Sequence, residues 1–227
     1  MSTILITGAN RGIGFHMAQQ YSARGDQVIA CCRDPQKAPE LAALDNVRVE
    51  AVEVGDAASV AALKERLGDL ALDVVINNAG MAGPGPDQQN AQQMDFDGWA
   101  ETFNINTMAP LRVLQALRPN LANGTNAKAV TITSQMGALS LDMPVMYAYC
   151  SSKAAVNKVM KMYAMDAAND KIAVQLIHPG WVKTDMGGEQ AAIEPADSAS
   201  GIIKVIDDLS MENTASFMQW NGEAHGW

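Results

Sequence analysis

The sequence has 227 residues, of which 48% are hydrophobic and 18% are charged, a composition typical of one folded globular domain and not of a disordered chain. Its formal net charge of −9 disfavours binding to the phosphate backbone of nucleic acids. No apolar run reaches the about 18 residues that a membrane-spanning helix needs, and Met1 to Gly8 lacks the basic start of a secretion signal. We therefore expect a single domain that binds neither nucleic acid nor membrane.

The cysteines and histidines form no pattern typical of a disulfide framework or a metal site. They are Cys31, Cys32, Cys150, His16, His178 and His225. Two of the cysteines are adjacent in an apolar run, and the histidines lie far apart without cysteine or acidic neighbours. We expect a reducing, cytoplasmic setting and no bound metal.

Short β-branched segments alternate with longer segments rich in helix-forming residues. The predicted strands are Thr3–Thr7, Gln27–Cys31, Val47–Val52, Asp73–Ile76, Ala129–Thr133 and Ile172–Ile177. The predicted helices span residues 13–24, 36–44, 57–68, 98–121 and 147–168. Because strand–helix–strand units make successive strands parallel, this alternation predicts an α/β domain whose parallel sheet is covered by helices on both faces.

Two stretches rich in proline, glycine and polar residues are predicted loops, Ala82–Gln93 and Gly187–Pro195. The second follows the carboxyl end of a strand. It is either a substrate loop near residues 185–195, hinged at Gly187 and Gly188, or a plain surface loop. The methionines in the last predicted helix are expected to pack in the core; they are Met160, Met162 and Met165.

A glycine-rich turn joins the first predicted strand to the first predicted helix. It reads Thr7-Gly8-Ala9-Asn10-Arg11-Gly12-Ile13-Gly14. Glycines in this context allow a tight turn and let a pyrophosphate approach the N–H groups at the helix start, which predicts dinucleotide binding. The spacing differs from the commoner G-x-G-x-x-G, and the lack of a Lys-Ser/Thr pair excludes a P-loop.

The end of the second predicted strand, Cys31-Cys32-Arg33, indicates which dinucleotide is bound. Domains that bind NAD usually carry a carboxylate there, which holds the ribose diol. Here Arg33, together with Arg11, could bind the 2′-phosphate of NADP, so we expect NADP(H) to be preferred over NAD(H). The alternative is that both arginines are simply solvated.

Tyr149 and Lys153 are four residues apart in a predicted helix, which places both side chains on one face. This spacing alone is weak evidence. Further segments able to carry a site follow the other predicted strands or lie within a predicted helix: Asn77-Asn78-Ala79-Gly80, Asn106, Ser134 and His178-Pro179-Gly180.

In this order and spacing, the motifs resemble the short-chain dehydrogenase/reductase family. The matching positions are Thr7-Gly8-x-x-x-Gly12-x-Gly14, Asn77-Asn78-Ala79-Gly80, Ser134, Tyr149-x-x-x-Lys153 and Pro179-Gly180. The segments around Ser134 and Tyr149, the run Gly180–Gly188 and the closing Gly222–Trp227 are similar to the small carbonyl reductases of the Sniffer and C-factor branch. The resemblance implies a Rossmann-type, doubly wound sheet of about seven strands in one dinucleotide-binding and catalytic domain.

The resemblance also implies roles for individual residues. The catalytic residues would be Asn106, Ser134, Tyr149 and Lys153. The cofactor would contact Gly8, Asn10, Arg11, Gly12, Ile13, Gly14, Arg33, Glu53, Val54, Asn78, Ala79, Gly80, Tyr149, Lys153, Pro179, Gly180, Val182 and Thr184. Glu53 departs from the family, which commonly has Asp at this adenine-contacting position, and Asn78 could act mostly as scaffold.

The chemistry of these side chains suits proton transfer. We expect the Lys153 ammonium to lower the pKa of the Tyr149 phenol, which is ordinarily near 10. In a reduction, Tyr149 would then protonate a carbonyl oxygen that the Ser134 hydroxyl holds. In the resembling enzymes the lysine also binds the nicotinamide ribose, and Asn106 interrupts its helix and helps to hold a water beside that lysine.

These features predict an NADP(H)-dependent oxidoreductase that interconverts a carbonyl compound and its alcohol. The expected walls of the substrate pocket are mostly apolar, which favours a hydrophobic substrate; they are Gln135, Met136, Met143, Met146, Trp181 and Met186. The alternative is an NADP-binding signalling or regulatory protein of the C-factor type. The resemblance also implies a homodimer or homotetramer that pairs through the helices at 98–121 and 147–168.

Overall fold

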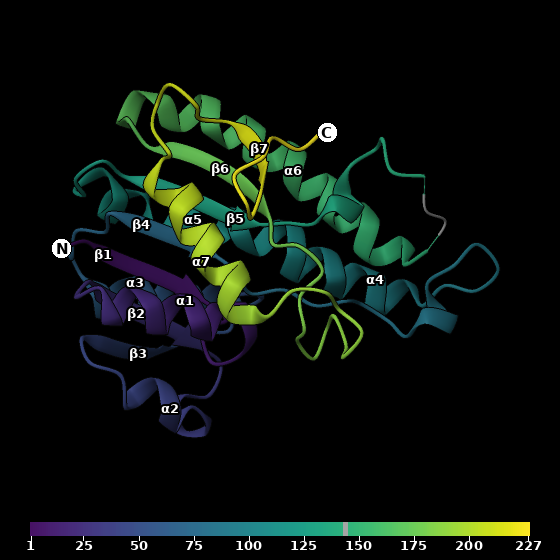
Figure 1. The fold of residues 1–227 in the computed structure, drawn as a ribbon, viewed down its shortest axis with the longest axis horizontal. Helices are drawn as coiled ribbons and strands as arrows, with labels where there is room; N and C mark the ends of the chain where they lie inside the picture. The colour runs from purple at the N-terminus through teal and green to yellow at the C-terminus, as the bar shows by residue number, and fades with distance from the viewer. Residues whose placement is uncertain (143–144) are drawn as a thin grey trace.

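The computed structural model describes residues 1–142 and 145–227 and contains, within them, one seven-stranded sheet. Its strands are β1 (Thr3–Thr7), β2 (Gln27–Cys32), β3 (Val47–Ala51), β4 (Val74–Asn77), β5 (Lys128–Ile132), β6 (Ala173–His178) and β7 (Ser216–Gln219). All neighbouring strands pair in parallel, in the order β3-β2-β1-β4-β5-β6-β7 (Figure 1). The aliphatic character of these strands follows from the burial of both faces of the sheet.

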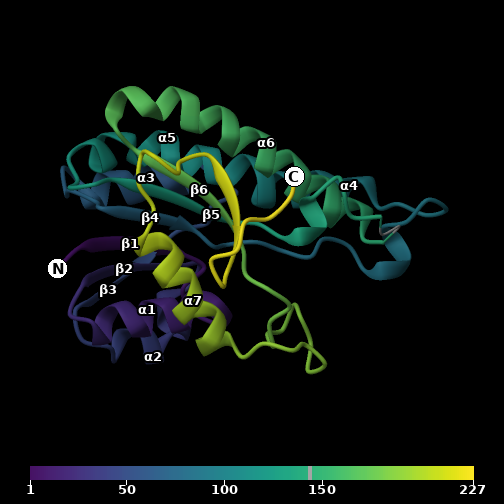
Figure 2. The same ribbon diagram turned by 45° about the horizontal axis from the view of Figure 1, so that its top comes forward.

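Helices cover both faces. They are α1 (Gly12–Ala23), α2 (Pro39–Ala42), α3 (Ala57–Leu67), α4 (Phe96–Phe103), α5 (Ala109–Ala122), α6 (Tyr147–Ala167) and α7 (Pro195–Asp207). On one face, α1 and α7 bury Met17 and Ile202 against a core that includes Ile4 and Ile6 of β1. On the other face lie α3, α5 and α6 (Figure 2). The predicted doubly wound α/β fold is thus confirmed.

This topology determines where a ligand can bind. The strand order reverses between β1 and β4, and an open α/β sheet has a crevice at the carboxyl ends of its strands beside such a reversal. The carboxyl ends of the strands face the right-hand side of Figure 1, toward α4. The loops that follow β1 to β6 begin at this edge and carry most of the predicted site residues, so the site is drawn from widely separated parts of the chain.

The strands predicted up to residue 177 lie within one residue of their expected ends, but four features differ from the predictions. The helix expected at 36–44 is a 3₁₀ turn, Pro35–Lys37, followed by α2, because Pro39 cannot donate the N–H that a continuous helix requires. The helix expected at 98–121 starts earlier, at Phe96, and the break that the resemblance implies at Asn106 is a π-helical turn, Asn104–Met108. Finally, α7 and β7 were not located from the sequence.

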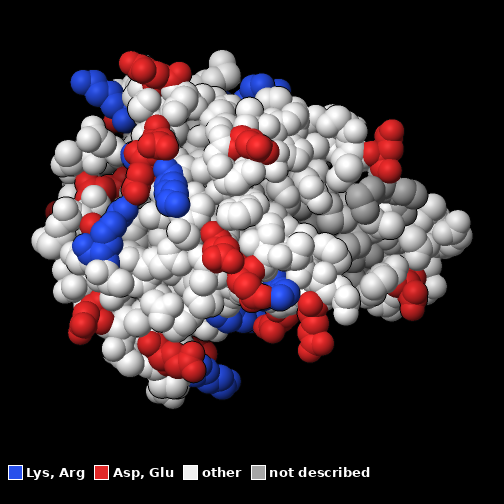
Figure 3. Space-filling model, in the orientation of Figure 1, with Lys and Arg blue, Asp and Glu red and all other residues white. Residues whose placement is uncertain are grey.

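Charged side chains of both signs are interspersed on the face shown in Figure 3. The right-hand end of that face, over α4 and the neighbouring loops, carries few charges. In the described part of the chain, no helix combines the length and apolar character needed to cross a membrane.

Candidate functional site

The turn between β1 and α1 is shaped for a ligand that approaches the backbone. Gly8 and Gly12 have φ angles of +64° and +53°, which favour glycine. A Cβ at Gly14 would lie 2.3 Å from the Gly8 carbonyl oxygen. The N-terminus of α1 has neither a side-chain cap nor an acidic residue in its first turn, so its N–H groups can bind an anion. Asn10 is exposed in this turn, and Ile13 packs toward the core. The turn and the free N-terminus of α1 together fit the expected pyrophosphate.

Thr7 and Asn78 tie this turn to the end of β4. The Thr7 hydroxyl accepts hydrogen bonds from the N–H groups of Asn78 (3.0 Å) and Ala79 (3.1 Å). The Asn78 side-chain amide donates to the carbonyl oxygens of Thr7 and Gly8, at 3.0 Å in each case. The Asn78 side chain therefore serves the scaffold. Thr7 is part of the motif noted in the sequence, but the role of its hydroxyl was not expected.

The two arginines expected at the 2′-phosphate have different surroundings. Arg33 follows β2, is exposed, and takes part in none of the ion pairs found among the described residues. Arg11 instead pairs with Asp185, on the loop that follows β6, and both side chains are exposed. Arg33 can therefore reach a phosphate without losing an ion pair, whereas Arg11 would have to exchange Asp185 for it.

The segment after β6 runs past the glycine turn. Gly180 has a φ of +87°, and a Cβ there would lie 2.3 Å from Ile193 Cδ1. Val182 is buried and forms a β-bridge with Ile193, which closes the base of the predicted loop. Thr184 lies beside the turn, since its Cγ2 is 3.2 Å from the position that a Cβ on Gly12 would take. The segment from Pro179 to Thr184 therefore runs next to the glycine turn.

Ser134, Tyr149 and Lys153 come together beyond the end of β5. Tyr149 and Lys153 are 9% and 6% exposed, and they occupy one face of α6. The Lys153 Nζ lies 5.8 Å from the centre of the Tyr149 ring and donates to the Ile132 carbonyl oxygen at 3.0 Å. Ser134 caps a 3₁₀ turn, and a Cβ on Gly137 in that turn would lie 2.7 Å from the Lys153 backbone. Glycine at position 137 is thus what allows the Ser134 segment to pack against α6.

Burial dominates the acid–base properties of this group. It raises the pKa of Tyr149, and hydrogen bonding with the Ser134 side chain acts in the opposite direction. Burial also lowers the pKa of Lys153 to about 8. The expectation that Lys153 lowers the pKa of Tyr149 is therefore wrong for this structure, because desolvation of the phenolate outweighs the stabilising contacts and the opposing contribution comes from Ser134.

Asn106 lies in the π-helical turn and holds the segment after β4. Its side chain accepts from the Met81 N–H (2.9 Å) and donates to the Met81 carbonyl oxygen (2.8 Å) and to the Ser152 hydroxyl (3.0 Å). A Cβ on Gly80 would lie 3.2 Å from the Asn106 Oδ1 and 3.7 Å from the Lys153 Nζ, so Gly80 sits between the two. The predicted break in the helix at Asn106 is present. Ser152, which was not expected from the sequence, links the break to α6.

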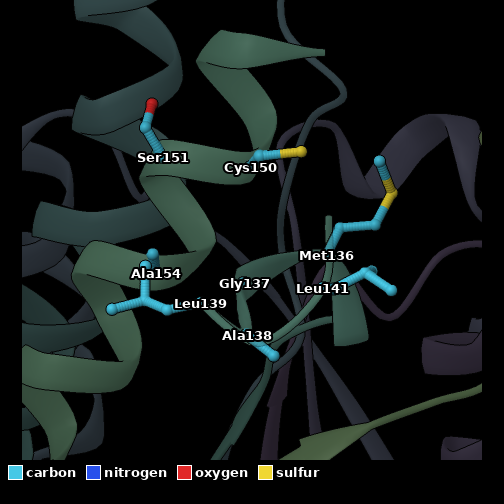
Figure 4. Close-up of a pocket in the computed structure, with 8 residues that line it drawn as sticks. All are labelled: Met136, Gly137, Ala138, Leu139, Leu141, Cys150, Ser151 and Ala154. Atoms are coloured by element: carbon cyan, nitrogen blue, oxygen red, sulfur yellow. The ribbon is translucent and has the colours of Figure 1, made fainter. Parts of the chain in front are cut away.

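A cavity of about 200 Å³ opens between the segment after β5 and α6 (Figure 4). Its lining is mostly apolar: Met136, Gly137, Ala138, Leu139, Leu141, Cys150, Ser151 and Ala154. Figure 4 shows the Met136 and Cys150 side chains pointing to the same side of the cavity, from the turn after β5 and from α6.

The lining overlaps only in part with the pocket walls expected from the sequence. Met136 is the expected residue that lines this cavity, whereas Trp181 and Met186 lie on the loop after β6 and are 53% and 50% exposed. The expected wall residue Met143 lies outside the described residues.

No group of three or more His, Cys, Asp or Glu side chains in the described part of the chain could hold a metal ion. His178 is buried, and its ring centre lies 5.7 Å from that of His225. Burial, helped by His225, lowers the pKa of His178 to about 4, which indicates a neutral packing residue.

Comparison with known proteins places these features in a family. The short chain dehydrogenase family model matches residues 2–194. The 1-hydroxy-2-glutathionyl-2-methyl-3-butene dehydrogenase of Rhodococcus sp. (strain AD45) is 36% identical over 234 residues, covering 100% of both chains. The C-signal protein of Myxococcus xanthus is 38% identical over 157 residues, covering 69% of this chain and 93% of that protein.

Among solved structures, the NADPH-bound carbonyl reductase from chicken fatty liver superposes with a TM-score of 0.91 at 32% identity, covering 100% of this chain and 99% of that one. The predicted resemblance to the Sniffer and C-factor branch is confirmed. Both the sequence and the fold thus show that the chain belongs to the short-chain dehydrogenase/reductase family.

Proposed function

We propose that this protein is an NADPH-dependent reductase of carbonyl compounds, with cofactor site and catalytic site in one domain spanning residues 1–227. The observation that carries the proposal is the meeting of Ser134, Tyr149 and Lys153 in a buried position near a glycine turn that fits a dinucleotide. The family and the carbonyl reductases of similar structure support this class of reaction.

Each side chain has a defined part in the proposed reaction. When bound, NADPH supplies a hydride for the carbonyl carbon. Tyr149 gives its phenolic proton to the carbonyl oxygen, which becomes the hydroxyl of the alcohol, and the Ser134 hydroxyl donates a hydrogen bond to the same oxygen. Because the pKa of Tyr149 is raised, the phenol carries its proton at neutral pH and is available as the donor. With a pKa of about 8, Lys153 is mostly protonated at neutral pH, and hydrogen bonding with Ser134 favours the phenolate left behind.

The proposed preference for NADPH depends on Arg33. Because a guanidinium binds a phosphate through charge-assisted hydrogen bonds, Arg33→Ala is expected to raise the Kd for NADPH by about 10- to 100-fold and to leave the Kd for NADH unchanged. Fluorescence titration with each cofactor measures both values. Lys37→Ala, which removes an exposed cation from the same connection, is the matched control. An equal loss of affinity for the two cofactors would contradict the assignment of Arg33 to the 2′-phosphate.

The proposed substrate class is apolar ketones and diketones. The end of the molecule over α4 carries few charges on the face in Figure 3, and the loop after β6 presents Trp181 and Met186 to solvent. In a panel of carbonyl compounds tested with NADPH, we expect the kcat/KM for apolar ketones to exceed that for sugars by about tenfold or more, since the surroundings offer few polar partners for hydroxyl groups. Equal or better turnover of a sugar would overturn this substrate class.

We also propose a cytoplasmic homodimer or homotetramer. The exposure of Met162 (54%) and Met165 (75%) on α6 supports pairing through this helix. Their exposure also corrects the expectation that the methionines of this helix pack in the core, which holds for Met160 alone among the three.

A second candidate function is suggested by the similarity to the C-signal protein, namely an NADP-binding signalling protein. The two functions differ in their dependence on Tyr149. A signalling protein would keep its biological effect after loss of the phenolic hydroxyl, whereas a reductase would lose its effect together with its turnover.

A further inference from the structure

The turn after β3 is held in place by side chains from the π-helical turn and from α5. Glu53 and Val54 lie in this turn, and they are the residues expected beside the adenine of the cofactor. Two contacts come from beyond α4: the Asn104 side chain donates to the Gly55 carbonyl oxygen (3.2 Å), and Arg112 donates to the Val54 carbonyl oxygen (2.7 Å). Arg112 also donates to the Asn104 Oδ1 (3.0 Å), so the two side chains act as one unit.

These contacts fix one particular peptide group. The carbonyl oxygen of the Val54–Gly55 peptide is held by Arg112, while the N–H of the same peptide donates to the Glu53 Oε1 at 3.3 Å. The orientation of this peptide thus decides whether its N–H points at the Glu53 carboxylate. Without Arg112 the peptide can rotate, and both the Glu53 carboxylate and the backbone of Val54 lose their defined positions.

The turn also packs closely around Gly55, next to the peptide that Arg112 holds. Val54 is 7% exposed, and a Cβ on Gly55 would lie 2.6 Å from Ile105 Cδ1 and 3.0 Å from the Asn104 Nδ2. The turn is therefore pressed against the same π-helical segment that carries Asn106. Asn106 itself is held separately, by Met81 and Ser152, so loss of Arg112 leaves the contacts at the reactive end in place.

We propose that Arg112 is a positioning residue for the adenine end of the cofactor, which it serves by fixing the Val54–Gly55 peptide and through it the Glu53 carboxylate. The inference rests on the proposed function. Arg112 is a half-buried residue of α5. It would contribute to the affinity for the cofactor and not to the proton transfer at Tyr149.

The test compares Arg112→Met with wild type. The adenine half of the cofactor, 2′,5′-ADP, is titrated by calorimetry, and steady-state rates are measured over a range of NADPH concentrations. Because a hydrogen bond from a charged donor is lost, we expect the Kd for 2′,5′-ADP and the KM for NADPH to rise by about tenfold, with kcat at saturating NADPH unchanged. Arg118→Met, which removes the α5 arginine that pairs with Asp170, is the matched control and should leave all three values as in wild type.

Several outcomes would overturn the inference. An unchanged Kd for 2′,5′-ADP in Arg112→Met would do so, as would a fall in kcat without a rise in KM. If Arg112→Met does not fold, Arg112→Lys, which retains one flexible donor group, should show an intermediate Kd, and a wild-type Kd in that variant would overturn the proposal. Failure of wild type to bind 2′,5′-ADP would remove the proposed cofactor itself, which distinguishes that failure from the failure of Arg112 alone.

Discussion

Replacement of Tyr149 by Phe is expected to lower kcat by about 10²- to 10⁴-fold, the usual contribution of a positioned proton donor. The change removes the hydroxyl and keeps the ring, which is 9% exposed and packed in the core of the site. Cofactor affinity should therefore stay within about twofold of wild type, since the glycine turn and Arg33 are untouched. Steady-state rates with NADPH and a ketone, combined with a fluorescence titration of NADPH, measure both quantities.

Tyr147→Phe provides the matched control for this experiment. Tyr147 lies two residues earlier in α6 and is 37% exposed, so the same atom is removed from the same helix at a more exposed position. We expect wild-type kcat in this control. Retention of turnover by Tyr149→Phe would show that another group supplies the proton and would favour the signalling candidate.

Replacement of Lys153 by Met is expected to abolish most turnover and, at neutral pH, to stabilise the fold. Burial lowers the pKa of Lys153 from 10.5 to about 8, so holding its charged form in the folded protein costs about 3 kcal/mol at neutral pH, since each pKa unit corresponds to about 1.4 kcal/mol. Loss of the hydrogen bond to the Ile132 carbonyl oxygen offsets about 1 kcal/mol of this gain. The net expectation is a fold that is more stable by about 2 kcal/mol and nearly inactive.

The difference in stability between Lys153→Met and wild type depends on pH. Because the unfolded chain binds a proton at Lys153 more tightly than the folded protein, the cost is fully present below pH 8 and disappears as the pH rises to 10.5. The advantage of Lys153→Met in urea unfolding should therefore shrink over this interval. Lys158→Met, on the exposed side of the same helix, should show no such trend. A Lys153→Met protein that is less stable than wild type at pH 7 would contradict the account.

The order of strands and helices could be predicted because it depends on local patterns. A buried parallel strand such as β1 is a continuous aliphatic run, and helix formers fill the segments between strands. The features that were missed lack this signature. The strand β7 is short, and Phe217 is its one fully buried residue. It is held by pairing with β6, and sequence periodicity does not reveal such pairing. The start of α7 was hidden because Pro195, its first residue, was taken as the end of the predicted loop Gly187–Pro195.

The candidate site could be predicted residue by residue only where a motif required a specific residue type. Gly14 and Tyr149 are examples, since one must lack a side chain and the other must carry a proton. Contacts between distant segments could not be predicted in this way. The pairing of Arg11 with Asp185 and the support of Asn106 by Ser152 depend on the three-dimensional arrangement of exposed or small polar residues. Such residues have no distinctive local pattern.

We propose that NADPH binds where the glycine turn and the segment after β6 lie side by side. Thermal unfolding in the presence of NADPH and of NADH tests this binding before any substrate is known. A ligand bound only by the folded protein raises the Tm, by about 5–10 °C at a concentration of about 100 times its Kd for a domain of this size. The account predicts that NADPH produces this increase at a far lower concentration than NADH. Stabilisation by NADH at an equal or lower concentration, or by neither cofactor, would contradict it.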